Sequence, residues 1–172
     1  ASIDYYGRYK ALQYVASRFF APVMISCEEQ GEHTQNPAIN ELRKEPIRCA
    51  ARLNVANETR MPVEGTVRWT LRTPDGKILR SGEQAVTVPA LSSLWLEELD
   101  FTDQVSLTGH YFSYALEVSG EEVSYGSVLF CNPKHFEWED PRLTVKTEGN
   151  EVVIRAEAYA GSVCVESDDP DL

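Results

Sequence analysis

The sequence is poor in the residues from which metal and nucleophilic sites are usually built. It has four cysteines and three histidines in 172 residues, and no C-x-x-C pair. Zinc sites need closely spaced Cys and His ligands, so these counts argue against a zinc site. The histidines (His33, His110 and His135) have no Ser or Cys in an elbow-like context, so no catalytic triad is expected. The sequence predicts no metal, no cofactor and no catalytic residue.

Basic residues and long apolar runs are also scarce. Lys and Arg number 16 against 27 Asp and Glu, which gives a formal net charge of −11. Nucleic acids and anionic membranes both require a basic face, so neither is expected as a partner. No apolar run approaches the roughly 20 residues of a membrane span. Nothing in the sequence assigns a cellular compartment.

The four cysteines are Cys27, Cys49, Cys131 and Cys164. Each lies in an apolar or alternating stretch, and we expect buried free thiols that behave as small hydrophobic side chains. A disulfide between sheets is the alternative, with Cys49 and Cys131 as the pair that geometry would have to bring together.

The first 22 residues predict one amphipathic helix over residues 6–20. Asp4 can accept backbone N–H bonds as an N-cap, and Pro22 cannot continue a helix. One apolar stripe at helical spacing follows: Leu12, Val15, Ala16 and Phe19. From the residues alone, a helix packed on this chain's own sheet is the simpler interpretation.

From Pro22 onward the hydrophobic period changes from 3.6 to 2. Turn signals recur about every ten residues, as in an immunoglobulin-like β-sandwich. Residues 30–46 are a polar excursion with a short helical turn at 40–43. The predicted strands cover residues 23–29, 48–57, 66–72, 77–88, 94–101, 110–118 and 122–131.

Several positions in these strands carry specific expectations. Trp69 is predicted to be buried on the third strand, Gly82 to mark a bulge, and Tyr111 to form a tyrosine corner. In residues 48–57, one set faces the core (Cys49, Ala51, Leu53, Val55) and another faces water (Arg48, Arg52, Asn54).

After residue 131 the composition changes. Residues 132–141 contain two prolines and predict a linker that carries Phe136 and Trp138. Three short strands are then expected, over residues 143–147, 152–158 and 163–166. They are too few for a complete sandwich.

The run Ile-Asp-Tyr-Tyr-Gly-Arg-Tyr-Lys-Ala-Leu-Gln-Tyr at residues 3–14, followed by Arg-Phe-Phe-Ala-Pro-Val, resembles the end of the catalytic barrel in β-mannosidase-like enzymes of glycoside hydrolase family 2. Family members usually have Trp where this chain has Tyr9. Three later stretches also resemble this family: residues 34–37, residues 51–55, and Asp140-Pro141.

The resemblance implies a mainly β fragment in three parts. Residues 1–21 would be the last helix of a truncated catalytic barrel, residues 22–133 an immunoglobulin-like sandwich, and residues 134–172 a linker with part of a second sandwich. The family's two catalytic glutamates lie upstream of this motif. The chain would then be non-catalytic, with the missing barrel as its partner and carbohydrate bound through the parent only. Its helix would fold onto the sandwich or self-associate.

Candidate sites within the chain have simpler interpretations. The pairs Glu28-Glu29, Glu97-Glu98 and Glu121-Glu122 lie on strands, where neighbours point to opposite faces, so surface charge is expected. Asp168, Asp169 and Asp171 lack the spacing of a calcium loop. A sugar-stacking platform remains as an alternative, formed by Trp95, Tyr125, Trp138 and Tyr159.

Three functions therefore stay open. The first is a non-catalytic sandwich of a family 2 glycosidase of the β-mannosidase or β-galactosidase type. The second is a stand-alone carbohydrate-binding module, which needs an exposed row of aromatics. The third is a fibronectin-like interaction domain, which needs a large apolar or charged patch on one sheet face.

Overall fold

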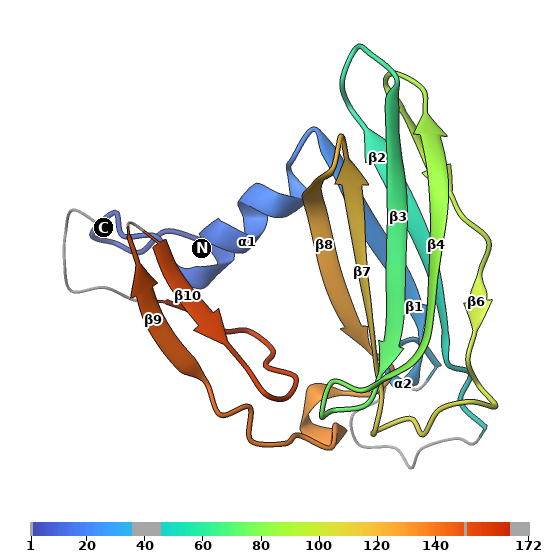
Figure 1. Cartoon of the computed structure of the whole chain (residues 1–172), viewed down its shortest axis with the longest axis vertical. Coiled ribbons are helices and arrows are strands. Elements are labelled where there is room, and N and C mark those ends of the chain that lie inside the picture. Colours follow the sequence, from blue (N-terminus) through green and yellow to red (C-terminus); the bar gives the residue numbers. More distant parts are fainter. Residues whose placement is uncertain (1, 36–45, 150, 166–172) are drawn as a thin grey trace.

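A computed structural model describes residues 2–35, 46–149 and 151–165. It contains one longer helix, a two-sheet sandwich and a separate hairpin (Figure 1). The mainly β fold with an N-terminal helix is therefore confirmed. The helical turn expected at residues 40–43 and the aspartates at 168–171 lie outside the described residues.

The first sheet has the strand order β1-β2-β5, with β6 also paired to β2. The β1–β2 register pairs Cys27 with Leu53 and Ile25 with Val55, which directs these four side chains to the core. The strands are β1 (Val23–Gln30), β2 (Ala50–Asn57), β5 (Ser92–Trp95) and β6 (Leu99–Asp100). The short helix α2 (Glu32–Gln35) follows β1.

The second sheet has the order β4-β3-β7-β8, and all of its pairs are antiparallel. Its strands are β3 (Val63–Arg72), β4 (Ile78–Val88), β7 (Tyr111–Val118) and β8 (Glu121–Leu129). The predicted turns are confirmed, since Gly76 and Gly120 have φ of 82° and 85°. These are left-handed values that glycine adopts without strain.

The core lies between the two sheets and consists of alternating inward side chains. Phe101, Phe112 and Phe130 are fully buried at its centre, with Leu53, Val55 and Leu116 around them. Burying such side chains contributes about 1.5–3 kcal/mol each. The predicted inward face of β2 is confirmed, but Asn54 on the other face is only 8% exposed instead of wet. Its cross-strand neighbours Ser26 and Trp95 flank it.

Two further expectations about single residues are wrong. Trp69 is on the inner face but is only half-buried. The β3–β4 irregularity lies between Leu71 and Arg72, not at Gly82. A Cβ on Gly82 would lie 2.5 Å from Cζ2 of Trp69, so this glycine makes room for the indole.

The segment after β8 is packed against the end of the sandwich. It begins with a 3₁₀ helix, η1 (Pro133–His135). Phe136 is buried beside Tyr111 and Cys131, and Tyr159 stacks on Tyr111 with ring centroids 4.1 Å apart. Tyr111 does open β7, but within the described residues its ring anchors this segment and no tyrosine-corner hydrogen bond is found.

The hairpin of β9 (Thr144–Glu148) and β10 (Glu151–Arg155) stands apart from the sandwich (Figure 1). The predicted strand at 163–166 is wrong for residues 163–165, which adopt no regular structure. None of the four cysteines, all of them in the described part, is in a disulfide bond, and Cys164 is exposed instead of buried.

Candidate interdomain surface

Residues 2–10 form a turn instead of the predicted start of a helix. Asp4 Oδ1 accepts the backbone N–H groups of Tyr6 (2.8 Å) and Arg8 (2.9 Å), and its N–H donates to the Arg8 carbonyl (2.9 Å). The Arg8 guanidinium donates to Asp4 Oδ2 at 2.7 Å. These bonds, with the Arg8 N–H as the largest cause, lower the pKa of Asp4. Asp4 therefore closes a turn and is not a helix cap.

Helix α1 (Ala11–Phe19) follows this turn. Its N-cap is Lys10, which makes no side-chain capping bond, and its end before Pro22 agrees with the prediction. Arg18 in the last turn lies over the Tyr125 ring of β8, 5.3 Å from the centroid. This cation–π contact is one point at which the helix meets the sandwich.

None of the residues of α1 is buried. Leu12 is 52% exposed, Val15 47% and Phe19 46%, so about half of each of these side chains is open to solvent. Tyr5, Tyr6, Tyr9, Tyr14 and Phe20 are exposed as well. An amphipathic helix normally buries such a stripe against its own core. The expectation that this helix lacks its natural cover is therefore consistent with its packing.

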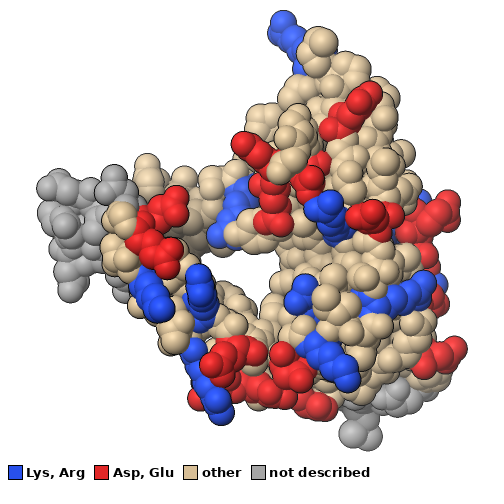
Figure 2. Space-filling view, viewed as in Figure 1, with Lys and Arg blue, Asp and Glu red and all other residues tan. Residues whose placement is uncertain are grey.

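The space-filling view shows how far α1 is from being enclosed. Figure 2 shows an open gap bordered by α1, the β9–β10 hairpin and the sandwich. Acidic and basic side chains are interspersed on the sandwich in this view, without a continuous basic surface. No helix among the described residues is long and apolar enough to cross a membrane.

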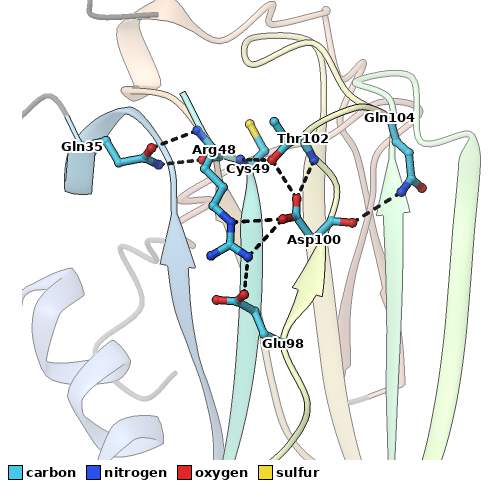
Figure 3. A network of polar contacts seen from close by, with 7 residues as sticks. All are labelled: Gln35, Arg48, Cys49, Glu98, Asp100, Thr102 and Gln104. Carbon is cyan, nitrogen blue, oxygen red and sulfur yellow. Dashed lines mark hydrogen bonds and ion pairs between the residues drawn. The ribbon is translucent and has the colours of Figure 1, made fainter. Parts of the chain in front are cut away.

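At the end of the sandwich away from α1, polar side chains form a network around Arg48 (Figure 3). Arg48 pairs with Glu98 and with Asp100 (3.0 Å), and these hydrogen bonds, the one to Glu98 first, raise the pKa of its guanidinium. Hydrogen bonds from Thr102 are the first cause that lowers the pKa of Asp100. Gln35 bonds the Arg48 backbone through both its amide atoms. The network fastens β6 and α2 to β2 and is structural.

The acidic pairs do not form paired carboxylates. Of Glu97-Glu98, Glu98 is paired with Arg48, and Glu121 and Glu122 are both exposed at the start of β8. The described residues hold no group of three or more His, Cys, Asp or Glu arranged for a metal.

One histidine does meet a carboxylate, which the sequence pattern did not indicate. Glu32 is only 3% exposed, accepts the Asn132 N–H at 2.8 Å and lies 2.9 Å from Nδ1 of His135. The two residues are about 100 positions apart, so no local signal could have paired them. Their contact closes the end of the sandwich.

The four aromatics proposed as a sugar platform are divided between the two sheets. Trp95 lies on the outer face of the first sheet with Arg52 over its ring at 5.1 Å, whereas Tyr125 lies on β8 of the second sheet. Tyr159 is stacked between Tyr111 and Trp138, with ring centroids 4.1 and 5.6 Å away. They form no common row, so the geometry does not supply a stacking platform from these residues.

Residues 50–135 match the family model described as Mannosidase Ig/CBM-like domain. The chain belongs to this family. No curated protein matches the chain. The Mannosidase Ig/CBM-like match covers β2 to η1, the greater part of the sandwich, and identifies it as an immunoglobulin-like domain of a type named for glycosidases.

Solved structures resemble the chain in fold. A β-D-mannosidase from Dictyoglomus thermophilum aligns with a TM-score of 0.62 and 22% identity, over 81% of this chain and 15% of that one. A β-glucuronidase from glycoside hydrolase family 2 (TM-score 0.43, 10% identity, 62% and 12% covered) and a putative β-galactosidase from Bacteroides fragilis (0.42, 10%, 81% and 19%) are more distant. This Mannosidase Ig/CBM-like chain thus spans less than a fifth of the length of each.

Proposed function

We propose that this chain is the non-catalytic C-terminal sandwich region of a family 2 glycoside hydrolase of the β-mannosidase-like branch. In the full protein, α1 would be the last helix of the catalytic barrel, and the sandwich would brace that barrel. The carbohydrate substrate would be bound and cleaved by the parent, not by this region.

The observation that carries the proposal is the unburied stripe of α1, on a chain whose sandwich belongs to the Mannosidase Ig/CBM-like family. The stripe of Leu12, Val15 and Phe19 suits a helix in the outer layer of a barrel, which buries its apolar side against the strands. The β-mannosidase branch is supported by the motif at residues 3–14 and by the name of the matching family.

The two alternatives receive less support from the geometry. A carbohydrate-binding module would present aromatics in one row, but Trp95 lies on the other sheet from Tyr125, and Tyr159 is stacked between Tyr111 and Trp138. A fibronectin-like interaction domain would account for the sandwich, but it would not account for α1.

The test compares the chain alone with the complete product of the reading frame that encodes it. We expect no turnover of p-nitrophenyl β-mannoside by the chain alone, because on this proposal both catalytic glutamates belong to the barrel. The carboxylates of Glu98 and Asp100 do approach each other, but both are paired with Arg48. The complete product should turn the substrate over. Turnover by the purified chain would contradict the proposal, whether or not Gln replacement of Glu28, Glu97 and Glu121 removes it, as would a complete product without a barrel.

A further inference from the structure

Two loops at one end of the sandwich are held together by a buried asparagine. Asn57 is 1% exposed, and its amide donates to the carbonyls of Met61 (2.8 Å), Val88 (3.1 Å) and Pro89 (3.0 Å). The Leu91 N–H donates to the Thr59 carbonyl at 3.0 Å. We call residues 58–62 and 89–91 the Asn57 tip. Its backbone is fixed by these bonds and is not a loosely held loop.

The Asn57 tip presents large apolar side chains to solvent. Met61 is 70% exposed and Leu91 is 72% exposed. Leu91 also has φ of 51°, a left-handed conformation that is unfavourable for a bulky residue and that Gly or Asn would adopt more easily. Strained residues held by their surroundings cluster at active sites, ligand clamps and switch regions. A strained, exposed leucine beside an exposed methionine is therefore a candidate contact surface.

The Asn57 tip is joined to the end of α1. The Glu58 N–H donates to the Pro22 carbonyl at 2.8 Å, three residues after the helix ends, and Phe20 between them is 78% exposed. Figure 1 shows the β2–β3 and β4–β5 connections at the end of the sandwich from which α1 departs. The start of the Asn57 tip therefore lies beside the C-terminal end of α1.

We propose that the Asn57 tip is a second contact between the sandwich and the catalytic barrel, with Met61 and Leu91 packed on the barrel's apolar surface beside α1; this inference rests on the proposed function. The partner is the barrel of the same polypeptide, because the tip is hydrogen-bonded through Glu58 to Pro22, directly after the helix that the barrel would cover. The contact would fix the angle between the two domains, which α1 alone leaves free to pivot.

The test measures maleimide labelling of single cysteines in a Cys164→Ser background, which removes the exposed native thiol. The probes are Met61→Cys in the Asn57 tip, Leu12→Cys in α1, and Ile78→Cys as the matched control. Ile78 is 50% exposed and lies at the other end of β4 from the tip. Each is labelled in the chain alone and in the complete product of the reading frame.

The core of an interface excludes solvent, so we expect Met61→Cys and Leu12→Cys to label at least about tenfold more slowly in the complete product than in the chain alone. Ile78→Cys should label at one rate in both. Protection of Leu12→Cys without Met61→Cys would overturn the tip contact and leave the proposed function standing. Protection of neither would overturn both.

A second copy of the chain is the competing occupant. If it covers the Asn57 tip, Met61→Cys labelling in the chain alone will slow as protein concentration rises, and this result would overturn the barrel contact. Leu91→Gly provides a second variant, since it removes the side chain and the strain together. It should restore Met61→Cys labelling in the complete product without unfolding the chain.

Discussion

At the scale of single residues, Trp69 and Gly82 depend on each other. The indole lies within 5.9 Å of Phe101 and 5.8 Å of Phe112, measured between ring centroids, and it crosses the neighbouring strand above Gly82. Arg80 lies over its ring at 5.6 Å. The pattern of Val67, Trp69 and Leu71 correctly predicted the face. It could not show that the indole would extend to the rim of the core, because that depends on a glycine in another strand.

Gly82→Ala should destabilise the sandwich by about 1–3 kcal/mol, as overpacking of a filled site does. In a Trp69→Ala background, which by itself should cost about 3 kcal/mol, the same change should cost little, since its clash is with the indole. Urea melts of the four-protein cycle measure this coupling, with Ser81→Ala as the control on the same strand. Additive losses would mean that the indole does not need the space above Gly82.

The cysteines should differ in reactivity because they differ in burial. Burial is the first cause that raises the pKa of Cys27 to about 12, with Glu29 contributing. At about pH 8 only Cys164 should react quickly with a disulfide reagent, and Cys164→Ser should remove that fast phase. A fast phase that survives Cys164→Ser would contradict the assignment of that phase to Cys164.

The raised pKa of Cys27 also makes the stability of the fold depend on pH. Because the unfolded chain ionises Cys27 at its usual pKa and the folded chain does not, the free energy of unfolding should fall as pH rises above about 8.5.

At the scale of elements, the strands were largely predictable and their ends were not. The alternating pattern of residues 48–57 predicted β2 correctly, because every residue of this strand follows both the apolar alternation and the pairing register with its neighbours. Helix α1 begins at Ala11 instead of residue 6, since the Asp4 side chain bonds the backbone of Tyr6 and Arg8. The Asp-x-x-Gly pattern at residues 4–7 is a turn signal that could have indicated this.

The helix α1 should be dispensable for the sandwich. Leu12→Glu with Phe19→Glu is expected to change the free energy of unfolding by no more than about 0.5 kcal/mol, as exposed substitutions do. The same double variant should weaken any self-association of the chain, because the stripe is what a second copy would cover. Light scattering and urea melts check the two parts. Loss of the sheet's circular dichroism in the variant would mean that α1 belongs to the domain's own core.

The stack of Tyr111, Tyr159 and Trp138 holds the segment that carries the C-terminal hairpin against the sandwich. Tyr159 N–H donates to the Pro74 carbonyl (2.8 Å), and its hydroxyl is 2.9 Å from that of Ser127. Neither contact was predictable, since each joins segments separated by other strands. Tyr159→Ala should free the segment that carries β9 and β10 while the sandwich stays folded.

Hydrogen exchange measures this directly. In Tyr159→Ala, amides of β9 and β10 should lose protection, and those of β2 and β7 should keep it. Tyr159→Phe serves as the control, because it keeps both ring stacks and removes only the hydroxyl bond. An unchanged hairpin in Tyr159→Ala would show that Phe136 and Trp138 suffice to hold the segment.

At the scale of the whole molecule, residues early in the chain form hydrogen bonds with residues about 100 positions later. The Ile25 N–H donates to the Ser124 hydroxyl, and the Asn132 N–H donates to Glu32, across 99 and 100 positions. Contacts of such separation slow folding. At roughly 5–20 residues per second, a ribosome needs about 5–20 s to pass from Glu32 to Asn132. During that interval the sandwich cannot close. On the proposed function, a barrel that precedes α1 would be synthesised in full before the sandwich is complete, and the sandwich would fold against it.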